Sequence, residues 1–286
     1  MLMEKVLLAT DFSDSARNLQ HCVGELKGLG LKEVVLTHVV DIQSSALAST
    51  VLQKHNQEVL EEEKKKLTKM GLEVKVRVEL GYPPQKIVET AREEKVSLIL
   101  VGSHGKGFLR ELLLGSTAFD IIRSSDIPVY VEKYRYREGE VAEPVCSNRL
   151  GSVLVPVDFS RCSEEAVEKV LALGKSMEKV TLVAVIESSE DPEELEKTKK
   201  EYDYSLEEIA GRFKKIGVSV VSRVEVGLAS EKIMEVADEV GTTMIVLSTR
   251  GAGRLQRLFL GSTADAVARR SRYPTLLIPC RKPLRT

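Results

Sequence analysis

The sequence predicts an α/β protein made of two similar doubly wound domains, each with a five-stranded parallel sheet flanked by helices. Three observations support this prediction. Short apolar runs alternate with apolar stripes of helical spacing along the chain. The tetrapeptide Gly115-Ser116-Thr117-Ala118 recurs 146 residues later as Gly261-Ser262-Thr263-Ala264, and a fixed offset of this kind marks an internal repeat. The length of 286 residues suits two domains of ordinary size.

The predicted elements follow one another in the same order in both copies. Near-continuous runs of Val, Leu and Ile predict strands at 6–10, 34–40, 74–80, 98–102 and 129–132, and at 153–157, 180–186, 218–226, 244–248 and 275–279. Between them, helical patterns cover 15–29, about 46–70, 84–94 and 116–125, with counterparts in the second copy. Pro84 lies at a helix start, where its missing N–H costs nothing. Because strands alternate with helices, right-handed crossovers should give mostly parallel sheets covered on both faces.

The repeat extends over nearly the whole chain. Gly71, Gly81, Gly105 and Pro128 return at the offset of 146, as Gly217, Gly227, Gly251 and Pro274. Asp11-Phe12-Ser13 returns at an offset of 147 as Asp158-Phe159-Ser160, so a one-residue difference lies in the first helix region. We therefore expect one domain at 1–135, a linker at 136–149 and a second domain at 150–286. The linker contains glycine and proline and has neither a helical nor a strand period.

The composition is that of a soluble globular protein and narrows the possible partners. Hydrophobic residues make up 43% and charged residues 30%, which suffices for a core in each half. The net charge is −1, so we expect neither a nucleic-acid partner nor an anionic membrane surface. No apolar run approaches the roughly 18 residues of a membrane span, and the N-terminus lacks the features of a signal peptide. The expected location is the cytoplasm.

The four cysteines predict neither a disulfide framework nor a zinc site. Cys22, Cys146, Cys162 and Cys280 lie far apart and form no CxxC pair. Thiol chemistry at Cys22 or Cys162 is one interpretation, and a small buried hydrophobe on a helix is the favoured one. A reducing compartment fits this pattern.

The carboxyl ends of the strands are where a doubly wound sheet binds ligands. The informative feature there is the loop after the fourth strand, Gly102-Ser103-His104-Gly105, followed by nine residues and then Gly115-Ser116-Thr117. Glycines let the backbone approach an anion closely, and the helix that begins at Ser116 presents unpaired N–H groups and a favourable dipole. The pattern predicts a phosphate site. The alternative is that the glycines only form turns and Ser116 only caps the helix.

Familiar phosphate and catalytic motifs are absent from this loop. A Walker A motif would need Lys and then Ser or Thr after Gly107, which Phe108 follows instead, and Arg110 occupies the last glycine position of a dinucleotide fingerprint. His104 is expected to be a spacer or a ligand hydrogen bond rather than a general base, and no histidine pair has metal-site spacing. We therefore expect a non-enzyme, with slow ATP hydrolysis left open.

The spacing Gly102-x-x-Gly105, nine residues, Gly115-Ser116, together with the opening Leu8-Ala9-Thr10-Asp11-Phe12-Ser13, resembles the ATP-binding pattern of the universal stress protein, or UspA-like, family. The likeness covers both copies. It implies strand order 3-2-1-4-5, with adenosine between the ends of the first and fourth strands and phosphates on the glycine loop. It further implies an ATP-binding regulator or sensor, with AMP or ADP as other ligands and Mg²⁺ or Mn²⁺ bridging the phosphates.

The resemblance also leaves an alternative function open. Some members of the family bind no nucleotide and act as dimeric stress factors through protein partners. Single-domain members tend to dimerise through their last strands, so the two copies here are expected to pair as a pseudo-dimer within one chain, and a homodimer is a further possibility. The last predicted strands, 129–132 and 275–279, each follow a proline and would supply the pairing edges.

Carried over to this sequence, the resemblance assigns a complete set of contacts in the first copy. Thr10 and Asp11 would meet the nucleoside, and Val39 and Val40 would flank adenine. The phosphates would be held by Gly102, Gly105, Gly115, Ser116 and Thr117. The alternatives are a turn or helix-entry role for Asp11 and ordinary strand core for the two valines.

The second copy keeps only part of the pattern. Asp158 keeps the nucleoside end, and Gly251, Gly261, Ser262 and Thr263 keep most of the phosphate end. Ser248 stands where the first glycine of the loop should be. Its Cβ would crowd a phosphate or strain a glycine-like backbone, so the two sites should be unequal, with the first copy the stronger.

Overall fold

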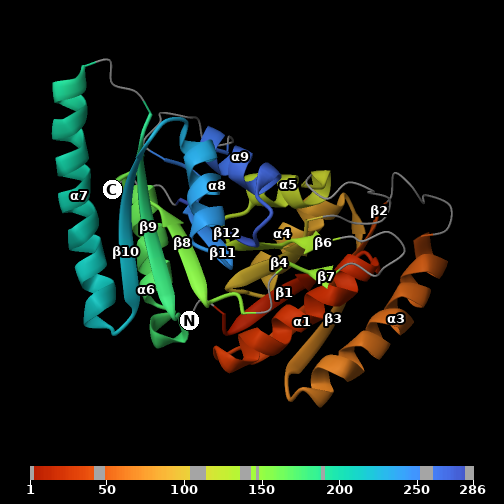
Figure 1. Cartoon of the computed structure of the whole chain (residues 1–286). Coiled ribbons are helices and arrows are strands. Elements are labelled where there is room, and N and C mark those ends of the chain that lie inside the picture. The colour runs from red at the N-terminus through yellow and green to blue at the C-terminus, as the bar shows by residue number, and fades with distance from the viewer. Residues whose placement is uncertain are drawn as a thin grey trace, which may run out of the picture. The chain divides into compact units, whose positions relative to one another are not determined.

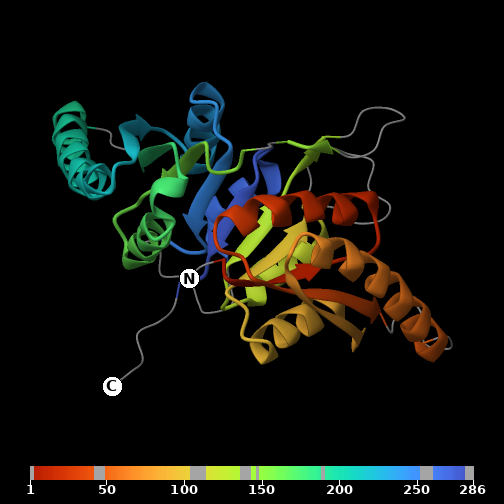
Figure 2. The ribbon, with the colours of Figure 1, turned by 90° about the horizontal axis from the view of Figure 1, so that it is seen from below.

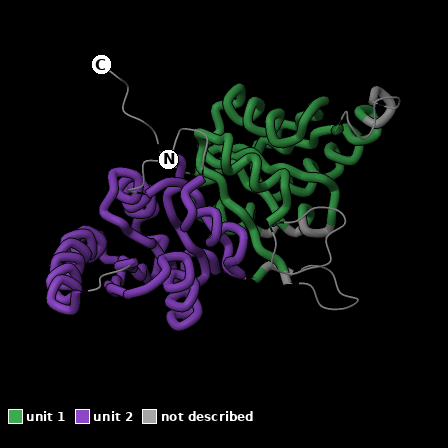
Figure 3. Tube along the Cα trace, turned by 90° about the horizontal axis from the view of Figure 1, so that it is seen from above, with its two compact units in different colours: residues 1–145 green, residues 146–286 purple. Residues whose placement is uncertain are grey.

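A computed structural model of the protein describes residues 3–41, 49–103, 114–135, 143–145, 148–187, 191–251 and 260–280 (Figure 1). The chain divides into two compact units, residues 1–145 and 146–286, coloured separately in Figure 3. The boundary between the units falls inside the segment expected to be a linker. Each unit is described by itself.

The first unit has the predicted alternation of strands and helices. Its elements are β1 (Lys5–Ala9), α1 (Asp14–Gly28), β2 (Glu33–Asp41), α3 (Ser49–Lys69), β3 (Glu73–Gly81), α4 (Pro83–Glu93), β4 (Leu98–Gly102), α5 (Ser116–Ser124) and β5 (Val129–Glu132). The strands pair in parallel in the order β3-β2-β1-β4-β5. This order confirms the predicted doubly wound topology.

The second unit repeats this architecture. Its elements are β8 (Ser152–Pro156), α6 (Arg161–Leu171), the short 3₁₀ helix η1 (Gly174–Ser176), β9 (Lys179–Ile186), α7 (Pro192–Lys215), β10 (Ser219–Val226), α8 (Ala229–Glu239), β11 (Met244–Ser248), α9 (Ser262–Arg270) and β12 (Thr275–Ile278). The parallel order is β10-β9-β8-β11-β12. Each unit therefore has the order 3-2-1-4-5.

The core of each unit lies on both faces of its sheet. The three central residues of β1 and of β8 are fully buried, as expected for strands covered on both sides. In the first unit α1 lies on one face, and α4 packs against α5 on the other (Figure 2). This two-sided cover is the consequence of right-handed crossovers in a parallel sheet.

Two pairs of repeated glycines are explained by the backbone. Gly71 and Gly217 follow the long helices α3 and α7 with φ of +78° and +79°. Gly81 and Gly227, at the ends of β3 and β10, have φ of +144° and +139°. A side chain is disfavoured in both conformations. The repeat therefore preserves turn geometry at these positions.

The structure differs from two sequence-based expectations. The segment expected to be a linker contributes a strand, β7 (Glu143–Pro144), which pairs antiparallel with β6 (Tyr134–Arg135) at the end of the first predicted domain. Strands of two residues are too short to produce a recognisable period. The expectation of no disulfide is wrong, because Cys162 and Cys280 form one, with 5.1 Å between their Cα atoms. The spacing of the cysteines along the chain could not predict this bond, because the parallel topology of the sheet is what brings the two residues to one edge. Cys22 is a buried free thiol on α1, as predicted.

Candidate functional site

The turn after the first strand of each unit has the same construction. Asp11 Oδ1 accepts hydrogen bonds from Ser13 N at 3.0 Å and Ser13 Oγ at 2.5 Å, and Asp158 Oδ1 accepts from Ser160 N at 3.1 Å and Ser160 Oγ at 2.6 Å. Each serine also caps the helix that follows, α1 or α6. Both aspartates are therefore turn residues that lie at the carboxyl edge of the sheet.

The aromatic residue inside each turn has an uncommon backbone conformation. Phe12 has φ of +62° and Phe159 has φ of +57°, which bulky side chains rarely adopt. In the first unit the amide of Phe12 donates to Thr10 Oγ1 at 3.1 Å. Backbone strain of this kind persists where the surrounding structure enforces it, often at ligand sites. The same uncommon conformation occurs in both copies, so the repeated Asp-Phe-Ser sequence preserves the geometry of this turn.

The surroundings of the two aromatic rings differ. Phe12 stacks on His38, with 4.3 Å between ring centroids, and His38 Nδ1 lies 2.8 Å from the Thr10 carbonyl oxygen. Phe159 instead meets Tyr202 of α7 edge to face at 4.8 Å. Ala184, which has no ring, takes the place of His38 in the second unit. The side chains that surround the end of the second strand therefore differ between the two units.

The loop after the fourth strand is closed at its base in both units. Gly115 N donates to the Ser103 carbonyl at 2.7 Å, and Gly261 N donates to the Thr249 carbonyl at 2.9 Å. Each bond joins the residue after β4 or β11 to the glycine that caps α5 or α9. Neither helix has a side-chain cap hydrogen bond, so no capping side chain competes with a ligand for the N–H groups of its first turn.

Part of each loop lies outside the described residues. Residues 104–113 and 252–259 fall in this category, and they include Gly105 of the predicted set together with His104 and Arg110. Gly102 ends β4, and Ser116 and Thr117 are exposed at the start of α5. Val39 and Val40 are buried at the end of β2, which leaves both their core role and a role at the adenine open.

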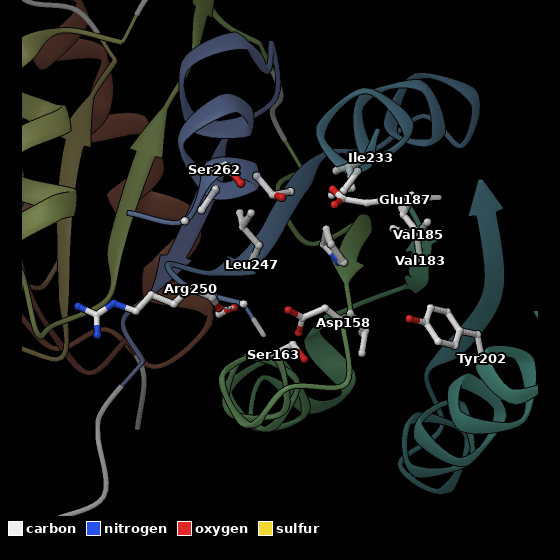
Figure 4. A pocket seen from close by; sticks show the side chains of 18 residues that line it. Asp158, Ser163, Val183, Val185, Glu187, Tyr202, Ile233, Leu247, Arg250 and Ser262 are labelled. Atoms are coloured by element: carbon white, nitrogen blue, oxygen red, sulfur yellow. Dashed lines mark hydrogen bonds between the residues drawn. The ribbon is translucent and has the colours of Figure 1, made fainter. Parts of the chain in front are cut away.

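A cavity of about 470 Å³ lies at the carboxyl edge of the second unit (Figure 4). It brings together every residue predicted for the second copy. These are Asp158, Gly251, Gly261, Ser262 and Thr263. Ser248 also lines it. Small-molecule sites commonly measure about 300–1,000 Å³, so the cavity has the size for a ligand of this class.

The cavity also contains residues that the sequence prediction missed. Val183 and Val185 reach it from alternate positions of β9, Glu187 from just beyond the end of that strand, Ile233 from α8 and Tyr202 from α7. Strand register places Val185 where Val39 stands in the first unit, so the repeat could have identified that residue. Tyr202 had no such signal, because α7 is rich in charged residues and reads as a solvated helix. Glu187 had none either, since it lies just beyond the strand.

Gly251 has a packing role inside this cavity. A Cβ added there would overlap the Asp158 carboxylate. Gly251 is not among the described glycines that have positive φ. Glycine is therefore required there by the close approach of the Asp158 carboxylate and not by the backbone conformation. The glycine loop and the aspartate turn therefore depend on each other sterically.

Ser248 fits its position without backbone strain. Among the described residues other than glycine, positive φ occurs at Phe12, Lys95 and Phe159, and not at Ser248. Its hydroxyl donates to the Arg250 carbonyl at 2.5 Å. The expected backbone strain is therefore absent at Ser248. The expectation that its Cβ would crowd a phosphate remains, because Ser248 lines the cavity.

The described residues contain no candidate metal site of their own. Over the described ranges, no group of three His, Cys, Asp or Glu side chains is placed to hold a metal ion. The same part of the chain has no helix both long enough and apolar enough to cross a membrane.

Comparison with known proteins agrees with the repeat and the fold. The model of the universal stress protein family matches residues 3–133 and 150–279. Universal stress protein MJ0577 of Methanocaldococcus jannaschii is 35% identical over 156 residues, covering 46% of this chain and 96% of its own. Universal stress protein Mb2028c of Mycobacterium bovis is 26% identical over 215 residues, covering 72% of this chain and 69% of its own.

A solved structure resembles the chain over nearly its whole length. The universal stress protein from Archaeoglobus fulgidus has a TM-score of 0.74 at 24% identity, covering 98% of this chain and 99% of that one. At this identity the likeness shows the fold. Taken with the two matches of the family model, it shows that this chain belongs to the universal stress protein family and carries two copies of its domain.

Proposed function

We propose that this protein binds adenine nucleotides and acts as a regulator or sensor rather than as an enzyme. The observation that carries the proposal is the construction of the carboxyl edge. In each unit the loop after the fourth strand is fastened to the uncapped N-terminus of α5 or α9, and the aspartate turn ends the first strand. Helix N-termini of this kind favour phosphate.

The residues divide naturally between the two ends of a nucleotide. Gly261, Ser262 and Thr263 offer backbone amides and hydroxyls at the phosphate end of the cavity. The aspartate turn and the valines of β9 would meet the nucleoside. The guanidinium of Arg250 extends away from the other labelled side chains in Figure 4. Phosphate binding in the second unit would therefore depend first on the helix N-terminus.

In the first unit the same roles fall to Thr10, Asp11, Val39 and Val40 at the nucleoside, and to Gly102, Gly105, Gly115, Ser116 and Thr117 at the phosphates. This unit has the full glycine set, so we propose that it holds ATP more tightly than the second unit does. The side chain of Ser248 narrows the corresponding wall in the second unit. AMP and ADP share the nucleoside and one or two phosphates, and would use the same residues.

Divalent metal would enter with the nucleotide. Since the described residues offer no cluster of metal ligands, Mg²⁺ or Mn²⁺ would be held mainly by the phosphates themselves. The Asp158 carboxylate is held by both the amide and the hydroxyl of Ser160, which fixes it as a structural and binding group. A regulatory role fits this arrangement better than proton transfer does.

Titration calorimetry with Mg-ATP, Mg-ADP and AMP tests the proposal. We expect Gly115→Val to remove the tighter site and Gly261→Val to remove the weaker one, with both lost in the double variant. Gly211→Ala, in the interior of α7 with no atom within 4 Å of the new Cβ, is the matched control. Absence of heat with all three nucleotides would favour the alternative function, a protein that binds no nucleotide and acts through protein partners. Steady release of phosphate from ATP would instead indicate an enzyme.

A further inference from the structure

The disulfide between Cys162 and Cys280 joins the start of α6, beside the second-unit cavity, to the segment that follows β12. Cys162 is the second residue of α6, directly after the turn that carries Asp158, and the next residue, Ser163, lines the cavity. Cys280 follows the end of β12. Their Cα atoms lie 5.1 Å apart although 118 positions separate them in sequence. The bond therefore fastens the nucleoside side of the site to the strand end beside the glycine loop.

Hydrogen bonds connect Cys280 to the phosphate end. Its amide donates to Thr249 Oγ1 at 3.4 Å, and Thr249 N donates to the Ile278 carbonyl at 2.8 Å. The Thr249 carbonyl in turn accepts the bond from Gly261 N that closes the loop. Thr249 therefore links the disulfide to the start of α9, and its neighbours Ser248 and Arg250 line the cavity.

The two cysteines are placed for exchange with an external thiol. Both are partly exposed. Cys162 lies in the first turn of an eleven-residue helix, where the helix dipole favours a negatively charged leaving group. Cys22, in contrast, is 1% exposed and donates its hydrogen bond to Glu132, so it is shielded from such chemistry.

The first unit has no equivalent of this pair. The positions that match Cys162 and Cys280 in the repeat are Ser15 and Tyr134, neither of which carries a thiol. The disulfide therefore belongs to the second unit, and no cysteine stands at the matching positions of the first. The turn at Asp11 and the strand end at Ser103 serve as an internal reference in the exchange experiment below.

We propose that Cys162 and Cys280 form a reversible redox pair that controls ligand binding in the second-unit cavity. The inference deepens the proposed nucleotide site and rests on it for the identity of the ligand. In the oxidised protein the disulfide fixes the turn at Asp158 relative to the strand end at Thr249, so the site is pre-organised. Reduction allows these two segments to move independently. Since pre-organisation lowers the cost of binding, the reduced site should bind about tenfold more weakly.

The exchange reaction needs a dithiol reductant. One thiolate of the reductant attacks Cys280 Sγ, the bond between the two protein sulfurs breaks, and the Cys162 thiolate leaves. The second thiolate of the reductant then attacks the mixed disulfide and releases Cys280. The protein gains two electrons and two protons and carries two thiols, while the reductant becomes a disulfide. Glutathione disulfide reverses the process through the same mixed-disulfide chemistry.

The test uses the full chain with Gly115→Val, which blocks the first-unit site. Mg-ATP affinity is measured after oxidation with glutathione disulfide and after reduction with dithiothreitol, and alkylation with mass analysis counts the thiols at Cys162 and Cys280. We expect affinity to fall on reduction. The variant with Cys162→Ser and Cys280→Ser should bind like the reduced protein and ignore dithiothreitol. Equal affinities in the two states, or no disulfide at any glutathione ratio, would overturn the proposal.

A second measurement separates this inference from the nucleotide proposal. Hydrogen–deuterium exchange of the peptides that contain Asp158 and Thr249 is followed in both redox states without ligand. Faster exchange of both peptides on reduction, with the matching peptides around Asp11 and Ser103 unchanged, supports redox control even if no nucleotide binds. Unchanged exchange at Asp158 and Thr249 would overturn it, whatever the protein binds.

Discussion

Replacing Gly261 by alanine should separate ligand binding from stability. Gly261 caps α9 with φ of −61° and ψ of 145°, which alanine adopts freely. The new Cβ would lie 3.4 Å from the Thr249 carbonyl oxygen and 3.5 Å from Arg250 Cα, both ordinary contacts. Alanine is a poorer cap than glycine but reduces the entropy of the unfolded chain, and these opposing effects leave the free energy of unfolding within about 1 kcal/mol of the parent.

The effect on binding should be larger, because Gly261 lines the cavity at the start of α9 and the methyl group would add bulk between the helix N-terminus and the backbone of residues 249–251. Loss of one charge-assisted hydrogen bond to phosphate amounts to about 1.5–3 kcal/mol, or roughly a 10- to 100-fold loss of affinity. Urea unfolding measures the stability change, and Mg-ATP titration in the Gly115→Val background measures the affinity. Unchanged affinity, or a loss of stability above about 2 kcal/mol, would refute the argument.

The next predictions concern three other features. Gly211→Ala, inside α7, and Gly241→Ala, at φ of +63°, form a matched pair of variants, because in both the new Cβ meets no atom within 4 Å. Urea unfolding should show Gly211→Ala stabilised and Gly241→Ala destabilised, each by about 1 kcal/mol. Stability changes of the same sign in both variants would contradict the explanation from backbone conformation. Burial lowers the pKa of Lys133 from 10.5 to about 8, so the unfolded chain binds more protons between these values. Stability should rise with pH across that window and stay flat in Lys133→Met. Reduction of the bond between Cys162 and Cys280, which closes a loop of 118 residues, should lower the stability of the second unit by up to about 5 kcal/mol, and the variant with both cysteines replaced by serine should not respond to dithiothreitol.

A double-mutant cycle tests the steric link between the loop and the aspartate turn. Gly251→Ala should displace the Asp158 carboxylate from Ser160 and lower both stability and affinity. In the Asp158→Ala background the same substitution should cost much less, giving a coupling energy of about 1–2 kcal/mol in urea unfolding. Additive effects would mean that the overlap at Gly251 is relieved without moving Asp158.

Much of the fold could be predicted because the sequence states it twice. Repeated glycines mark the ends of α3 and α7, where φ is positive in both copies. Runs of Val, Leu and Ile mark strands that are buried on both faces, and the structure places them in the expected parallel order. The glycine spacing also singled out Gly251 and Gly261, and both line the cavity of the second unit.

The rest depends on neighbours that are distant in sequence. Cys162 and Cys280 meet only because α6 begins and β12 ends at the same edge of a sheet, which spacing alone does not reveal. Tyr202 reaches the cavity from a helix whose composition is that of an exposed surface. The stack of Phe12 on His38 likewise needs the register of β1 with β2. Side chains of this kind are assigned by topology rather than by local pattern.

Nucleotide released from freshly purified protein tests the central claim most directly. The protein is denatured, the released nucleotide is identified by mass analysis, and its amount is compared with that of the chain. The proposed function predicts an adenine nucleotide at close to one per chain, lost when Gly102→Val and Gly115→Val are combined. Release of no nucleotide, together with no heat on titration of the folded protein with Mg-ATP, would contradict it.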